Sequence, residues 1–254
     1  MTSHLAGRIE RAFDARDTAA ADALCAPHYR EHGTVIDPVP TPVPTADGPR
    51  GRLGALLTGL PPDFRYSLEL TLQEGEFLAL IGVCEGLPGG PVGSVDLFRT
   101  HGGLLVEHWD ALGALPEVPF GPPHLRRYGI PEPDAARRHT EQAVRLLGAE
   151  GGLVYAERLG GRLGTHGHDG QPLRTGQRRL ERTVTDGGQV LLQSTLATVG
   201  GLRTEYRLYD LGRADAPTCW RLTAPQRPGA QAASAAPAAL PGGRRPDPAG
   251  ARRS

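Results

Sequence analysis

One stretch of the chain, residues 94–110 with the sequence SVDLFRTHGGLLVEHWD, constrains the fold more than any other. Two runs of alternating side chains flank a turn that contains two glycines. This pattern predicts a β-hairpin with strands at 94–99 and 104–110.

The hairpin also predicts a group of acid–base side chains. Side chains alternate between the two faces of a strand, so Asp96 and Phe98 share a face of the first strand. His108 and Asp110 share a face of the second. If the two faces coincide, two carboxylates and an imidazole project into one space beside Phe98. Trp109 then lies on the opposite face, where it packs against helices or a partner subunit.

The hairpin resembles the closing hairpin of the SnoaL-like polyketide cyclases, a family of the nuclear transport factor 2 (NTF2)-like superfamily. Their pattern runs D-x-F-R-x-x-x-G-K-I-x-E-H-W-D, and Leu104 stands here where that pattern has Lys. Upstream, the segment HYREHG resembles their Y-x-x-H-N-P motif. Tyr29 and His32 match it, and Gly33 replaces Asn. The resemblance implies a cone-shaped fold in which a curved sheet wraps around helices.

The resemblance also implies a chemistry. A carboxyl group in an apolar cone is desolvated and its pKa rises, so an aspartate there can act as a general base. Such a site abstracts a proton next to a carbonyl group and needs neither a metal nor an organic cofactor. The substrate is a small hydrophobic carbonyl compound or a polyketide. The expected catalytic residues are His32, Asp96, His108 and Asp110, and the expected substrate-binding residues are Tyr29, Phe98 and Trp109.

Each candidate catalytic residue also has a purely structural interpretation. Asp96 could pair with an arginine, His108 could be a buried core histidine, and Asp110 could end a strand or turn. His32 could be exposed at a helix end. The chain could then be a non-catalytic module that binds a small ligand or dimerises, or an accessory protein that holds a partner.

The order of the predicted elements is typical of an α+β fold, because helices come first and an antiparallel meander follows. Residues 28–32 are expected at a helix end or in a loop, and the Pro-rich residues 34–49 in an extended loop. The expected helices span 3–24, with a break at 17–18, and 50–60; strands are expected at 63–72 and 76–86, and a Pro- and Gly-rich linker at 111–128.

The second half of the chain repeats the first weakly. LELTLQEG at 68–75 resembles LERTVTDG at 180–187, and Trp109 falls opposite Trp220. We therefore predict a tandem pair of NTF2-like cone domains, each a curved antiparallel sheet wrapped around N-terminal helices. The predicted parts are residues 1–125 with the candidate active pocket, 126–228 as a degenerate second copy, and a disordered Ala/Pro/Arg tail at 229–254.

When the two halves are aligned, the second half carries other residues at the positions of the candidate acid–base residues. His32 becomes Arg158, Asp96 becomes Arg207, His108 becomes Cys219 and Asp110 becomes Arg221. The bulky framework residues are kept. The second half is therefore expected to have a structural or lid role and to pair with the first within one chain, unless two chains form a homodimer.

The composition of the chain limits which kinds of binding partner are expected. The formal net charge is zero, which argues against binding to nucleic acid or to an anionic membrane. The 3 cysteines lack metal-binding spacing, and there is neither a signal peptide nor an apolar run of about 20 residues, so we expect a cytoplasmic protein. The chain contains no Lys and no Asn, which indicates the G+C-rich coding typical of actinobacteria.

Overall fold

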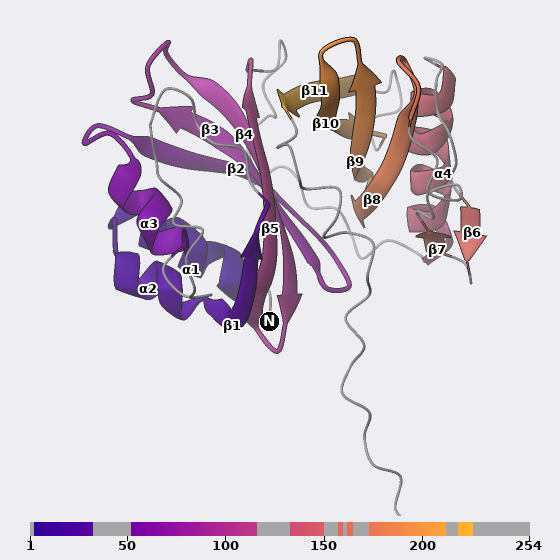
Figure 1. Cartoon of the computed structure of the whole chain (residues 1–254). Coiled ribbons are helices and arrows are strands. Elements are labelled where there is room, and N and C mark those ends of the chain that lie inside the picture. The colour runs from indigo at the N-terminus through magenta and orange to yellow at the C-terminus, as the bar shows by residue number, and fades with distance from the viewer. Residues whose placement is uncertain are drawn as a thin grey trace, which may run out of the picture.

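The computed structural model describes residues 3–32, 52–115, 133–149, 157–159, 162–164, 173–211 and 218–225. The fold is α+β with curved antiparallel sheets, as the sequence predicts, and its two sheets fit a two-domain arrangement (Figure 1). The Pro-rich segment 34–49 and the tail 229–254 lie outside the described residues, as does most of the expected linker. None of the described helices combines the length and the apolar character needed to cross a bilayer.

Three helices cover one face of the first sheet: α1 (Ser3–Asp14), α2 (Thr18–Ala23) and α3 (Arg52–Gly59). The predicted break after α1 is present, because Asp17 caps α2 and accepts a 2.9 Å hydrogen bond from the backbone N–H of Ala20.

The first sheet has the strand order β1-β5-β4-β3-β2, in which only the edge pair β1 and β5 is parallel. The predicted hairpin is the pair β4 and β5. The strands are β1 (Cys25–Glu31), β2 (Arg65–Glu74), β3 (Phe77–Glu85), β4 (Val92–His101) and β5 (Leu104–Gly113).

Strand β1 corrects the sequence analysis, which expected residues 28–32 at a helix end or in a loop. Pro27 lacks a backbone N–H, yet it is tolerated because β1 is an edge strand. The pairing with β5 is irregular between Cys25 and Arg30, where the proline lies. Strand β5 also continues to Gly113, so the linker begins later than predicted.

Strand β3 is buried on both faces. Leu78 and Leu80 belong to the core under the helices, whereas Ala79 and Ile81 belong to the core against the second sheet. The protein is thus built in four layers, with helices outermost and two sheets between them (Figure 1).

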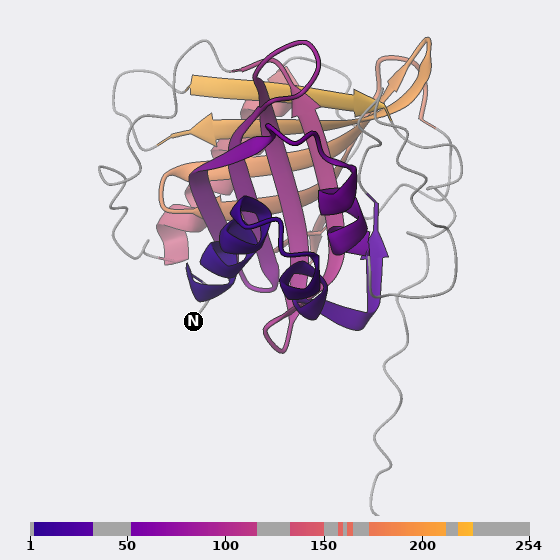
Figure 2. The same cartoon turned by 90° about the vertical axis from the view of Figure 1, so that its left-hand side faces the viewer.

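The second sheet has the order β11-β10-β9-β8, and α4 (Pro133–Ala149) covers its outer face. Its strands run across those of the first sheet in Figure 2. They are β8 (Arg178–Asp186), β9 (Gln189–Thr198), β10 (Gly201–Asp210) and β11 (Thr218–Pro225), and a separate short pair is formed by β6 (Glu157–Leu159) and β7 (Arg162–Gly164).

The two sheets pack directly on each other. Apolar side chains of both form one buried core, which contains Leu97 and Trp109 of the first sheet and Leu208 and Trp220 of the second. The Trp220 indole N–H donates to the backbone oxygen of Ala114 at 3.2 Å. The two halves are therefore held together by both apolar burial and hydrogen bonds.

Candidate active site

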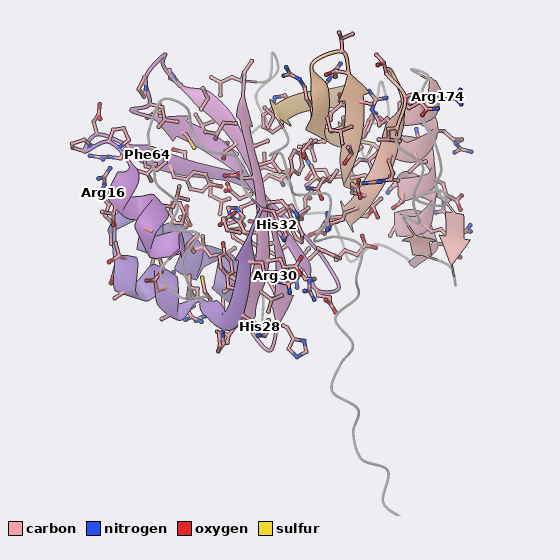
Figure 3. The ribbon with its side chains drawn as sticks, in the orientation of Figure 1. Arg16, His28, Arg30, His32, Phe64 and Arg174 are labelled. Carbon is pink, nitrogen blue, oxygen red and sulfur yellow. The ribbon has the colours of Figure 1, made fainter. Side chains whose placement is uncertain are left out.

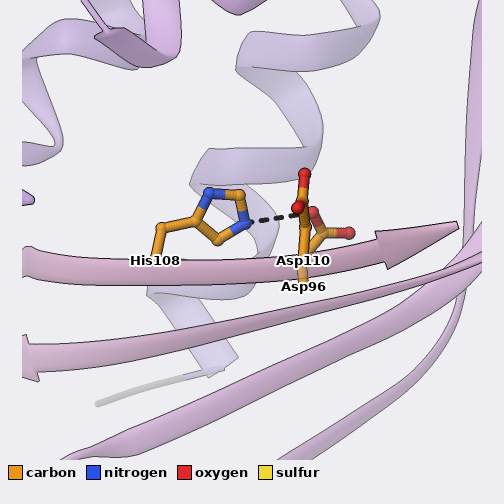
Figure 4. A group of neighbouring side chains, drawn as sticks. All are labelled: Asp96, His108 and Asp110. Atoms are coloured by element: carbon orange, nitrogen blue, oxygen red, sulfur yellow. Dashed lines mark hydrogen bonds and ion pairs between the residues drawn. The ribbon is translucent and has the colours of Figure 1, made fainter. Parts of the chain in front are cut away.

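The register of β4 and β5 brings three predicted acid–base residues together beside Phe98. Asp96 pairs with Asp110, and Phe98 pairs with His108. These side chains lie on the face that carries the helices, where Phe98 is part of the core. One side-chain atom from each of Asp96, His108 and Asp110 lies within 4.8 Å of the others (Figure 4).

His108 is held from both sides by carboxylates. Its Nε2 lies 3.2 Å from Asp96 Oδ1, and its Nδ1 lies 3.0 Å from Glu31 Oε2. Glu31 also accepts a 2.7 Å hydrogen bond from the Tyr29 hydroxyl. A hydrogen-bonded chain thus runs from Tyr29 through Glu31 and His108 to Asp96, across strands β1, β5 and β4.

These hydrogen-bonded carboxylates keep His108 protonated and positively charged. Burial alone lowers the pKa of His108, but the Glu31 charge, the hydrogen bonds to Asp96 and Glu31, and the Asp110 charge outweigh it and raise that pKa well above its ordinary value. Burial, the Glu31 charge and the bond to Glu31 also raise the pKa of Tyr29. At neutral pH the imidazolium and the protonated phenol are therefore both donors.

The hydrogen-bonded series of side chains is accessible to solvent mainly at one end. The side chain of His108 is 1% exposed and that of Glu31 12%, whereas that of Asp96 is 20% exposed. Phe98 stacks on the imidazole with 4.3 Å between ring centroids and 10° between planes, so it covers one face of the His108 ring. Among these hydrogen-bonded residues, Asp96 is the one that a ligand reaches most easily.

Glu31 was not among the predicted site residues, because the sequence analysis placed it at a helix end or in a loop. In a strand, residues two apart share a face, which brings Tyr29 and Glu31 to the same side. This alternation is the signal that could have identified Glu31. It was missed because Pro27 argued against a strand at these residues.

His32 and Trp109 do not join this group. His32, labelled in Figure 3, follows the end of β1. It stacks on Trp109 with 4.8 Å between ring centroids and 4° between planes, and its Nε2 lies 3.6 Å from Glu107. The guanidinium carbon of Arg182, from the second sheet, lies 3.8 Å from the centre of the Trp109 ring. Both residues therefore lie on the other face of β5, since Trp109 and His108 are neighbours in a strand.

The second sheet repeats this register with other residues. Arg207 pairs with Arg221, and Tyr209 pairs with Cys219, just as Asp96 pairs with Asp110 and Phe98 with His108. The Nε atoms of both arginines lie 2.8 Å from the buried carboxylate of Glu205. Arg158, aligned with His32, lies in β6.

The group of Asp96, His108 and Asp110 has the residue types of a metal site. A metal ion would need the lone pair of a neutral imidazole. The Nε2 atom of His108 instead faces Asp96 at 3.2 Å, and the pKa of the ring is raised. In this arrangement His108 donates a hydrogen bond to Asp96, and a metal ion would have to displace that proton.

No family model matches the chain. A curated protein of Parafrankia sp. (strain EAN1pec), described as an ATP-dependent dethiobiotin synthetase BioD, is 34% identical over 134 residues. The match covers 51% of this chain and 55% of that protein, so the chain spans about half the length of this relative.

Several solved structures are similar to about half of the chain or less. An NTF2-like protein of unknown function from Mesorhizobium loti is 25% identical over 44% of this chain and 91% of its own, with a TM-score of 0.35. IdmH, a candidate polyketide cyclase from Streptomyces antibioticus, is 22% identical over 44% and 91%, with a TM-score of 0.33. A candidate ketosteroid isomerase from Kribbella flavida DSM 17836 is 21% identical over 52% and 91%, with a TM-score of 0.35.

Proposed function

We propose that the first half of the chain is a SnoaL-like enzyme that performs acid–base chemistry without a cofactor on a small hydrophobic carbonyl compound or a polyketide. The observation that carries this proposal is the chain Glu31–His108–Asp96, which ends at the most exposed of its three side chains. The same chain supports a cyclase, an isomerase or an aldol-type lyase.

Asp96 is the general base in this proposal. Its carboxylate removes a proton from the carbon next to the carbonyl group, and the C–H electron pair moves into an enolate. His108 donates its Nε2–H to Asp96, and Glu31 holds the ring in place through Nδ1. Asp110, close to both, keeps the imidazolium charged.

The enolate then completes a redox-neutral reaction. Its carbon attacks a second carbonyl of the same molecule and forms a C–C bond, and the new alkoxide takes back the proton held by Asp96. Return of the proton to a different carbon instead shifts a double bond. Both routes move only protons and electron pairs, so neither requires a cofactor.

We also propose that the second half is a degenerate NTF2-like copy with a structural role. The matching strand registers support this, and so does an irregularity in equivalent places, between Leu68 and Leu70 and between Leu180 and Arg182. The turn glycines Gly75 and Gly187 have φ of 59° and 60°. With arginines in place of the carboxylates, this copy lacks the groups for the same proton transfer.

The main alternative is a non-catalytic ligand-binding module. In such a module the acids of the first sheet would be neutralised by arginines, as Glu205 is in the second sheet. Asp96 instead contacts a titratable imidazole. The name of the Parafrankia protein includes ATP dependence, but this sequence contains no Lys and therefore no phosphate-binding motif of the form GxxxxGK[ST].

The proposal is tested by proton exchange on a simple carbonyl probe. In D₂O the wild-type protein should catalyse deuterium uptake at the carbons next to the carbonyl of 2-tetralone, followed by NMR. Asp96→Asn should slow this by roughly 10²–10⁴-fold, since the amide cannot accept the proton.

The matched control is Glu85→Gln, which makes the same kind of change in an exposed residue at the end of β3. It should exchange like the wild type. Equal rates for wild type and Asp96→Asn would refute the general-base role. Mass spectrometry of ligands that co-purify with the native protein would then identify the natural compound.

A further inference from the structure

Two buried hydroxyl groups lie on the same face of the first sheet as the candidate site. The residues Tyr66 and Ser94 are 9% and 2% exposed. Neither hydroxyl oxygen makes a hydrogen bond of good geometry within the described part of the chain, although Ser94 lies close enough to Tyr66 and to Cys84 to lower the pKa of both. Leaving a buried hydroxyl without a partner costs about 1–3 kcal/mol, so the retention of both requires an explanation.

Gly82 brings the two hydroxyls toward each other. Across the sheet, Gly82 of β3 pairs with Ser94 of β4. A Cβ atom added to Gly82 would lie 2.9 Å from Cε2 and from Cζ of Tyr66, so the phenol ring of Tyr66 lies over this glycine. Cζ carries the hydroxyl group, which is therefore directed across β3 toward the strand of Ser94.

The hydroxyls also adjoin Asp96. Ser94 precedes Asp96 by two residues on the same face of β4, which is about 7 Å along a strand. Burial raises the pKa of Tyr66 well above its ordinary value, and the charge of Asp96 is the next contribution. Tyr66 is thus a hydrogen-bond donor at neutral pH.

We propose that the hydroxyls of Tyr66 and Ser94 bind an uncharged oxygen acceptor of the ligand, a ketone or ester carbonyl, and so determine which compounds the site accepts. The ligand reaches them from the side of Asp96, which is 20% exposed. The carboxylates of Glu31, Asp96 and Asp110 surround a single imidazolium, and this excess of negative charge disfavours a carboxylate or phosphate ligand.

This inference rests on the proposed function only in that Asp96 acts on the carbon beside the bound carbonyl. Binding is therefore measured separately from exchange, by titration calorimetry with 2-tetralone and with tetralin, which has the same ring system without the oxygen. The wild type should bind 2-tetralone more tightly. Tyr66→Phe should weaken 2-tetralone binding by about 5–10-fold, the value of one neutral hydrogen bond, and leave tetralin binding unchanged. Ser94→Ala should act in the same direction.

Tyr206→Phe is the matched control, because Tyr206 is a buried phenol between the two sheets that accepts a 2.8 Å hydrogen bond from Gln193. It should keep the preference for 2-tetralone. A wild type without that preference, or a Tyr66→Phe protein that retains it, would overturn the inference. If Asp96→Asn keeps the preference for 2-tetralone and the wild type catalyses no exchange, the proposed function fails and the binding inference stands.

Discussion

The Nε2 atom of His108 lies 3.2 Å from Oδ1 of Asp96, while Nδ1 of the same ring lies 3.0 Å from Glu31. The ring is therefore fixed at both ends and cannot turn without losing a charged partner. Because His108 is 1% exposed, these two carboxylates and the nearby charge of Asp110 decide its protonation state, and bulk water has little influence.

The first prediction concerns stability against pH. The folded pKa of His108 is raised above the unfolded value of about 6.5, so its contribution is complete below pH 6.5 and is lost as the pH rises through the folded pKa. Urea unfolding between pH 6 and 10 should show the wild type losing up to about 1.4 kcal/mol per pH unit relative to His108→Gln. A constant difference between the two proteins would contradict this.

The second prediction concerns Glu31. Glu31→Gln removes the charge that contributes most to raising the pKa of His108, so that pKa should fall. The measurement is NMR titration of the His108 ring. Glu69→Gln in β2 serves as the control, and its His108 should titrate as in the wild type. An unchanged His108 pKa in Glu31→Gln would mean that Asp96 and Asp110 alone hold the charge.

The third prediction concerns the packing of the two sheets. Trp109→Ala should lower the free energy of unfolding by about 3–5 kcal/mol, because it empties a site enclosed by His32, Arg182 and the second sheet. Urea unfolding measures this, and His101→Ala at the exposed hairpin turn should change it by less than about 0.5 kcal/mol. Similar values for both variants would show that the sheets contribute little to each other's stability.

The fourth prediction separates stability from binding at Tyr66. Its hydroxyl is buried and makes no hydrogen bond of good geometry among the described residues, with only the Ser94 hydroxyl nearby, so Tyr66→Phe should leave the melting temperature unchanged or raise it. Tyr206→Phe, which breaks a bond to Gln193, should lower it. Calorimetry of the two variants decides, and a clear loss in Tyr66→Phe would mean that the hydroxyl stabilises the unliganded fold.

The fifth prediction concerns the cysteines. Burial, together with neighbouring carboxylates, raises the pKa of Cys25 and of Cys84 to about 12, whereas Cys219 is exposed. Iodoacetamide at pH 8 should therefore label Cys219 first, and all 3 cysteines in urea. Mass spectrometry measures the labelling. Early labelling of Cys84 would reveal that the face under the helices opens in the native state.

The hairpin could be predicted because its information is local. Alternation within residues 94–110 places Asp96 and His108 on one face and Trp109 on the other, and only the register of one turn is needed to bring the first two together. The fold class followed from the order of helices and strands in the same local way.

The contact of Glu31 with His108 and that of Arg182 with Trp109 could not be predicted in this way. Glu31 reaches His108 across 77 positions of sequence through a parallel edge pairing, and nothing local specifies that pairing. The position of Arg182 over Trp109 depends on how two separate sheets pack. His32 lies apart from His108 because it is the neighbour of Glu31 and therefore faces the other side, where it stacks on Trp109.

Strand β5 serves two interiors at once, with His108 and Asp110 on one side and Trp109 and Ala111 on the other. Inserting or deleting one residue within it would exchange the two sets, pushing acids between the sheets and an indole among the helices. Substitutions and changes of loop length can therefore be accommodated, but the number of residues in β5 is fixed by the packing on its two faces.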